Sequence, residues 1–135
     1  MNYWLLKSEP DAYSWENLNE QKEGTWDGVR NYQARNNLRD MKKGDLALFY
    51  HSNIGKEIVG IATISKEHFP DPTIDDERWL AIKVKPKKAF KRPVTLIEMK
   101  ADPMLINLPL IKHSRLSVMP ISEEDFNYII KLSNS

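Results

Sequence analysis

Three short segments of the chain combine aromatic rings with hydrogen-bonding side chains, which suits a flat, polar ligand. They are Trp26–Tyr32 (WDGVRNY), Phe49–Asn53 (FYHSN) and the pair Ser114–Arg115. Aromatic faces can stack on a nucleobase, and amide, hydroxyl and guanidinium groups can hydrogen-bond to its edges. Stacking on an aromatic side chain contributes about 1–3 kcal/mol per base. The three segments are therefore candidates for a site that holds one nucleobase.

The same residues also have ordinary structural roles available to them. Large aromatic side chains often pack in a core, which would account for Trp26 and Tyr50. Asparagine is a favoured helix cap, which would account for Asn31. Arg30 could form an ion pair with Asp27 across its own loop. The residue types alone leave both interpretations open.

Other kinds of chemistry find little support in the sequence. The histidines, His51, His68 and His113, lack the i, i+4 spacing of a metal site and do not lie beside a carboxylate pair. His51–Ser52 and His113–Ser114 are neighbours, but adjacent strand residues point to opposite faces of a sheet. The glycines are scattered singly, so no phosphate-binding loop is indicated. We expect no metal, no cofactor and no catalytic residue.

Two basic stretches could contact phosphate groups, although the net charge is only +1. Residues 83–92 carry six basic side chains and no acid, and residues 30–43 carry a second group interrupted only by Asp40. Such runs can hold phosphates even on a nearly neutral protein. The alternative is that they are solvated surface. The candidate phosphate contacts are Lys83, Lys85, Lys87 and Lys88.

Alternating apolar residues predict the strands that would position these side chains. In the clearest run, 45–51, Leu48 and Tyr50 point to one side while Phe49 and His51 point to the other. Further strands are expected over residues 3–7, 57–66, 78–86 and 115–119. Gly60 suggests a bend or a close backbone approach, and the Pro/Asp-rich residues 69–77 are expected to form a loop.

Capping residues ahead of apolar stretches predict four helices. The expected caps are Ser14, Asn31, Thr95 and Ser122. Their helices would cover residues 15–20, residues 31–41, a stretch ending before Pro103, and a last stretch with Phe126 and Ile129 on its inner face. Short antiparallel strands with helices around their ends predict an α+β barrel.

Length and composition describe an ordinary globular domain. A chain of 135 residues, 41% hydrophobic and 29% charged, fits one domain covering residues 1–135. The absence of cysteine excludes disulfides and thiolate metal sites, and it fits a reducing interior. The apolar run at the N-terminus is interrupted by Lys7 and is too short for a signal peptide or a membrane span. We expect a monomeric, cytoplasmic protein without membrane contact.

Several segments together resemble the EVE-domain family. They are YWLLKSEP, YSWENL, WDGVRNYQARNNLRDMKKGDLALFYHSN, IVGIATI, FPDPT, PVTLIEMKADP, and SRLSVMPIS ahead of the last helix. The resemblance extends from Tyr3 to about Ile130, and the long central block is its most specific part. The basic N-terminal extension of nuclear eukaryotic members is absent, which favours a bacterial protein with access to the nucleoid.

The resemblance implies a PUA-like pseudo-barrel of mostly antiparallel strands with short surrounding helices, related to PUA, ASCH, YTH and SRA domains. Several of these relatives hold a modified base in a pocket at the barrel mouth. The implied ligand is a modified base in DNA or RNA, with modified cytosine favoured. By this resemblance Trp26 and Tyr50 would wall the pocket. The candidate polar contacts are Lys7, Ser8, Arg30, Asn31, His51, Ser52, Ser114 and Arg115.

Two classes of function stay open. The first is a non-catalytic module that binds a modified base. The second is a small enzyme acting on a nucleotide or RNA, as some ASCH relatives suggest, with His51 or a carboxylate as the base. A binding module would leave the modified nucleoside unchanged, whereas an enzyme would convert it.

Overall fold

The protein is built on one curved six-stranded sheet, and the computed structural model describes all residues from 1 to 135. The strands are β1 (Tyr3–Ser8), β2 (Gly24–Trp26), β3 (Leu46–His51), β4 (Glu57–Pro70), β5 (Leu80–Thr95) and β6 (Val118–Ile121). Their order across the sheet is β2-β5-β4-β3-β1-β6. Only β1 and β3 pair in parallel, and every other pairing is antiparallel. The predicted α+β class and the mostly antiparallel sheet are confirmed.

The helices are short, and four of them begin where the sequence places their caps. They are α1 (Trp15–Gln21), α2 (Tyr32–Asp40), α3 (Leu96–Ala101), the 3-10 helix η1 (Pro103–Leu105), α4 (Pro109–Lys112) and α5 (Glu123–Ser133). The side chains of Ser14, Asn31, Thr95 and Ser122 each accept a backbone N–H of the first turn, as predicted. A helix needs about 20 apolar residues to cross a membrane, and none of these helices qualifies.

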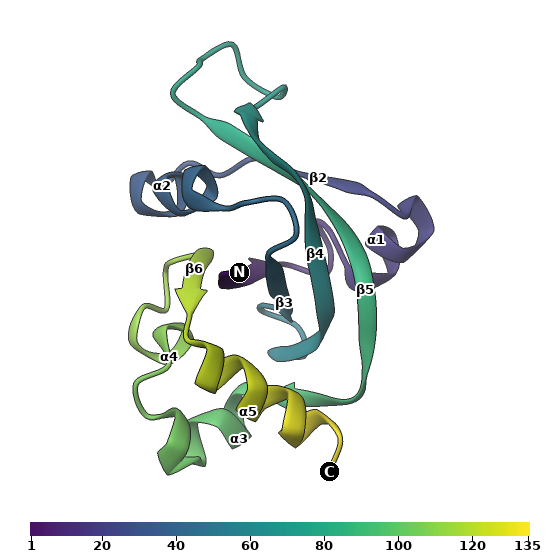
Figure 1. Cartoon of the computed structure of the whole chain (residues 1–135), viewed down its shortest axis with the longest axis vertical. Helices are drawn as coiled ribbons and strands as arrows, with labels where there is room; N and C mark the ends of the chain where they lie inside the picture. The colour runs from purple at the N-terminus through teal and green to yellow at the C-terminus, as the bar shows by residue number, and fades with distance from the viewer.

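Each face of the sheet is covered by its own hydrophobic core. Ala47 and Phe49 of β3 pack with residues of α1 and α2 on one face. Leu48 and Tyr50 pack with residues of α3, α4 and α5 on the other face. In Figure 1, α3, α4 and α5 gather beside β6 and the end of β5. The alternation predicted for β3 is therefore confirmed, and it places Phe49 and Tyr50 on opposite sides of the sheet.

Strands β4 and β5 form a long, bent hairpin that runs through the length of the molecule in Figure 1. Its register shifts next to Gly60, where a Cβ atom would lie 2.6 Å from the Trp15 ring. The close approach suggested for Gly60 is thus confirmed. Both strands are longer than predicted, because β4 continues to Pro70 and β5 continues through two prolines to Thr95.

The sheet does not close into a complete barrel. Strands β2 and β6 lie at its two ends and are not paired with each other, so the fold is a pseudo-barrel and not a closed barrel. Strand β2, η1 and α4 were not predicted, and β6 lies at 118–121 in place of the expected 115–119. The Leu116 N–H donates to the His113 carbonyl in a turn, and β6 begins only after this turn, at Val118. The single domain over residues 1–135 stays a prediction.

Candidate functional site

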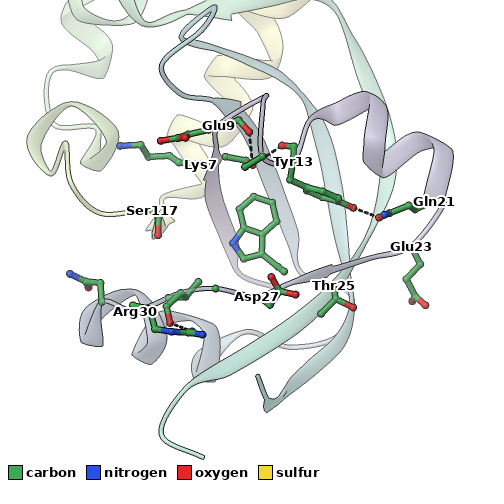
Figure 2. A pocket seen from close by; sticks show the side chains of 15 residues that line it. Lys7, Glu9, Tyr13, Gln21, Glu23, Thr25, Asp27, Arg30 and Ser117 are labelled. Carbon is green, nitrogen blue, oxygen red and sulfur yellow. Dashed lines mark hydrogen bonds between the residues drawn. The ribbon is translucent and has the colours of Figure 1, made fainter. Parts of the chain in front are cut away.

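A cavity of about 680 Å³ lies between the end of β1 and the segment that runs from β2 to α2. Figure 2 shows Lys7 and Tyr13 on one side of it and Asp27 and Arg30 on the other, with Ser117 at one end. The other lining residues are Ser8, Glu9, Ala12, Gln21, Glu23, Thr25, Trp26, Gly28, Val29 and Asn31. The volume falls within the range of roughly 300–1,000 Å³ that is typical of small-ligand sites.

The aromatic wall of this cavity consists of Trp26 and Tyr13. The Trp26 residue is 7% exposed, and its ring meets those of Tyr13 and Phe49 edge to face, with centroids 6.2 and 5.6 Å away. The Tyr13 hydroxyl donates to Gln21 Oε1 at 2.6 Å, and Ser8 Oγ donates to the Tyr13 carbonyl at 2.6 Å. Trp26 therefore belongs to the core and to the cavity at once. Tyr13 was not predicted, although it lies in the matched segment YSWENL.

Tyr50 does not line this cavity, which corrects the expectation that it forms a wall opposite Trp26. It is 3% exposed and lies in the core formed with α3, α4 and α5. Its neighbour Phe49 is the residue that supports Trp26 from behind. Because successive strand residues point to opposite faces, the two aromatic residues of β3 cannot serve the same side of the sheet.

The carboxylate of Asp71 fixes the segment that forms one wall. Its Oδ2 accepts hydrogen bonds from the Gly28 N–H and Arg30 Nη1, both at 2.9 Å, and its Oδ1 accepts from the Thr73 N–H and hydroxyl. Burial would raise the pKa of Asp71, but these hydrogen bonds, led by those of Thr73 and Arg30, lower it to about 2. Gly28 adopts φ = 76°, a left-handed conformation that favours glycine. Arg30 is thus paired with Asp71 and not with Asp27.

Burial is the leading cause of the pKa shifts of two charged groups of the cavity, Asp27 and Lys7. Partial burial of its carboxyl group, and then the negative charge of Asp71, raise the pKa of Asp27 although the residue as a whole is exposed, while the charge of Arg30 opposes the shift. Burial also lowers the pKa of Lys7, whose Nζ donates to the Ser114 carbonyl at 2.6 Å. Asp27 can accept a hydrogen bond from an amino group of a ligand, and Lys7 and Ser117 can donate to a carbonyl. Asp27 and Ser117 were absent from the predicted set.

Asn31 combines its two proposed roles. Its side chain accepts the Ala34 N–H at 2.9 Å and so caps α2, and the residue also lines the cavity. It borders a second cavity of about 410 Å³ as well, which contains Ser114 and Arg115. The structure therefore places Ser114 and Arg115 beside the first cavity and not within it.

His51 and Ser52 lie outside both cavities. His51 Nε2 accepts the Trp15 N–H at 3.0 Å, and its ring packs edge to face on Phe49. Burial lowers the pKa of His51, against the opposing charges of Glu16 and Glu57. Since the Nε2 lone pair is already engaged by the backbone of α1, His51 is held in a structural role.

The first part of the lysine run of β5, Lys83 and Lys85, lies near the acidic residue Glu23. A hydrogen bond from Ser65 lowers the pKa of Glu23, as do the charges of Lys85 and Lys83. Glu23 thus offsets part of the charge of this run, whereas Lys87 and Lys88 are exposed further along the strand. Phosphate binding by Lys83, Lys85, Lys87 and Lys88 stays a prediction.

The fold first places the chain in a broad structural class. An ASCH protein of Zymomonas mobilis superposes with a TM-score of 0.62 over 97% of this chain and 95% of its own, at 10% identity, which shows a shared fold alone. The sequence profile of the EVE domain then matches residues 2–132. The chain belongs to the EVE-domain family, as its sequence motifs predict.

Relatives of the chain match it over nearly its whole length. Thymocyte nuclear protein 1 of Mus musculus is 38% identical, with 99% of this chain and 74% of the mouse protein aligned. A crystal structure of an Agrobacterium tumefaciens protein is 41% identical with a TM-score of 0.96, covering 98% and 93% of the two chains. The human THYN1 protein in complex with DNA containing 5-methylcytosine is 34% identical with a TM-score of 0.94, covering 100% and 99%.

Proposed function

We propose that this chain is a non-catalytic DNA-binding module that holds a modified cytosine, in the first instance 5-methylcytosine, in the cavity beside Trp26. One observation carries the proposal. A cavity with an aromatic wall and several hydrogen-bonding groups is present in a chain that superposes over its full length on a human protein bound to 5-methylcytosine DNA. DNA is favoured over RNA on the same ground.

The polar groups of the cavity fit the edge of a cytosine. Cytosine offers an amino donor at N4, and a carboxylate is a suitable acceptor for it. Asp27 supplies that carboxylate. Thymine carries the same 5-methyl group but presents a carbonyl oxygen at position 4, which an ionised Asp27 repels. Asp27 would therefore distinguish 5-methylcytosine from thymine.

The size of the cavity requires the base to leave the helical stack. An extruded base costs a few kcal/mol of lost stacking and pairing. Stacking against an aromatic side chain contributes about 1–3 kcal/mol to binding, and hydrogen bonds along the base edge contribute further. Trp26 and Tyr13 supply the aromatic surface, and Asp71 holds Gly28 and Arg30 in place before the base arrives. Such preorganisation reduces the entropy lost on binding.

We favour a binding module over an enzyme because of the position and the hydrogen bonding of His51. Of the two kinds of base considered for an enzyme, His51 or a carboxylate, His51 lies outside the cavity with its Nε2 engaged by the Trp15 N–H. The remaining polar groups of the cavity are suited to recognising a base edge. A module of this kind would act wherever the protein can reach DNA, which agrees with the expected nucleoid-accessible location in a bacterium.

The test is a titration of Asp27→Ala and wild type with three oligonucleotides of one sequence that differ in a single base, 5-methylcytosine, cytosine or thymine. Wild type should bind the 5-methylcytosine form most tightly. Loss of a hydrogen bond to a charged group costs about 1.5–3 kcal/mol, so the variant should bind it roughly 10- to 150-fold more weakly. The preference for 5-methylcytosine over thymine should also be smaller in the variant than in wild type.

Glu124→Ala is the matched control, because it removes the same charge from an exposed position on α5. It should bind like wild type. Asp27 is exposed, so its replacement should leave the fold intact, and circular dichroism checks this. Equal wild-type affinity for all three oligonucleotides, or an altered base in the ligand recovered by chromatography, would contradict the proposed function.

A further inference from the structure

The second cavity adjoins the first and has a different chemical character. It lies between the start of α2 and the segment that joins α4 to β6, and we name it the α2–β6 groove. Its lining residues are Asn31, Gln33, Lys112, His113, Ser114, Arg115 and Leu116. Asn31 lines both cavities, so the groove begins where the first cavity ends.

The first cavity is lined by acidic and basic side chains, whereas the groove is lined by basic side chains only. The first cavity contains three carboxylates, those of Glu9, Glu23 and Asp27, against the cations of Lys7 and Arg30. The groove contains Lys112 and Arg115 and no acidic residue. The ion pairs of the protein involve Arg30, Arg78 and Arg92, so no carboxylate neutralises either groove cation at close range. A phosphate group is therefore attracted to the groove and repelled by the acidic part of the first cavity.

The walls of the groove are tied together by hydrogen bonds from residues beneath them. Lys7 Nζ donates to the Ser114 carbonyl at 2.6 Å, which holds the α4–β6 segment against β1. The buried Asn37 of α2 donates from Nδ2 to the Val118 carbonyl at 2.7 Å, which holds α2 against β6. The spacing between the two walls is thus set by the fold.

We propose that the α2–β6 groove binds the phosphate groups next to the extruded nucleotide, with Arg115 and Lys112 as the contacts. This inference rests on the proposed function, because a base in the first cavity stays joined to its sugar and its flanking phosphates. Those phosphates must lie just outside the cavity. On the groove side they meet unneutralised cations, whereas near Lys83 and Lys85 they meet Glu23 as well. The groove is therefore preferred over the lysine run of β5.

The experiment measures binding as a function of salt for wild type and the double variant Lys112→Ala/Arg115→Ala. The probes are two oligonucleotides of one sequence, one with a single 5-methylcytosine and one with cytosine. Each lost phosphate contact lowers the salt slope by about one unit, so the double variant should lose about two. Binding of both oligonucleotides should be weakened by the same factor, because contacts to phosphates do not depend on the identity of the base. Both side chains are exposed, so the variant should fold normally.

Lys100→Ala/Lys131→Ala is the matched control, since it removes the same charge from exposed positions of α3 and α5, outside both cavities and outside the lysine run. It should keep the wild-type slope. An unchanged slope in the Lys112/Arg115 variant, or a reduced slope in the control alone, overturns the groove as the phosphate site while the wild-type preference for 5-methylcytosine still stands. Absence of that preference in wild type contradicts the proposed function instead, and the groove inference fails with it.

Discussion

Several single residues serve the structure and the candidate site at the same time. Trp26 is 7% exposed and lines the cavity, and Asn31 caps α2 while bordering both cavities. Truncating Trp26 would remove core packing worth about 3–5 kcal/mol, which would obscure any loss of base stacking. Asp27 is exposed and has no comparable role in the core. Binding is therefore tested more cleanly at Asp27 than at Trp26.

His51 should make the stability of the protein sensitive to mild acid. Burial lowers its pKa below the ordinary value of 6.5, so the unfolded chain binds a proton at a higher pH than the folded chain does. The free energy of unfolding should therefore fall as the pH drops below about 6.5 towards the folded pKa. His51→Gln keeps an acceptor for the Trp15 N–H and cannot titrate. Urea denaturation between about pH 7.5 and 5.5 should show a weaker pH dependence for this variant.

His113→Gln provides the comparison, because it makes the same substitution at an exposed histidine. If His51→Gln and wild type lose stability equally on acidification, His51 does not have the structural role described above. DNA binding by His51→Gln should also match wild type. A large loss of binding in a folded variant would return His51 to the ligand site.

The sequence could predict cavity residues where they lie within one recognisable segment. Lys7, Ser8, Trp26, Arg30 and Asn31 were expected and line the cavity. The roles of Tyr13 and Asp71 could not be predicted, because they depend on contacts between distant parts of the chain. Gly28 and Asp71, for example, are joined by a hydrogen bond across 43 residues. Alternation along β3 separated Phe49 from Tyr50 but could not indicate which of the two lies on the same side of the sheet as Trp26.

At the scale of elements, the loop after β4 determines the shape of the segment between β2 and α2. Asp71 is the link, and Asp71→Ala should leave the Gly28 N–H without its acceptor and Arg30 without its carboxylate partner. Loss of hydrogen bonds to a charged group costs roughly 1.5–3 kcal/mol. We expect a loss of stability of that order and weaker DNA binding, because one wall of the cavity loses its support. Denaturant unfolding and titration with the 5-methylcytosine oligonucleotide measure the two effects.

Asp75→Ala is the control for this change, since Asp75 is an exposed carboxylate of the same loop. The pKa of Asp71 is lowered from 3.8 to about 2, so its stabilising contribution is present above about pH 3.8 and is lost as the pH falls towards about 2. Asp71→Asn should remove that part of the acid dependence. Wild-type stability in Asp71→Ala would show that the loop does not depend on this carboxylate.

Helix starts were predictable because capping is a local interaction within four residues. All four caps lie where the sequence indicates. Strand lengths were less predictable, since a strand extends as far as it can pair with a neighbouring strand, which its own sequence does not reveal. Proline usually marks the edge or end of a strand, so β5 was expected to stop at Pro86, but it continues to Thr95 beside β4. Strand β2 has only three residues and too short a pattern to be recognised.

At the scale of the whole molecule, the cavity lies where the sheet remains open. Strands β2 and β6 are the two ends of the sheet. Thr25 and Trp26 of β2 line the cavity together with Ser117, which directly precedes β6. Closing the barrel would pair these two edges and remove the space between them. The pseudo-barrel thus provides a site from backbone edges as well as from side chains.

The most direct measurement is a crystal structure of this protein with a DNA duplex that contains a single 5-methylcytosine. We predict that this base is extruded and chemically unchanged, that it occupies the cavity against Trp26 and Tyr13, and that its N4 amino group lies within hydrogen-bonding distance of Asp27. A 5-methylcytosine that remains stacked in the duplex, or that is bound away from this cavity, would contradict the proposed function.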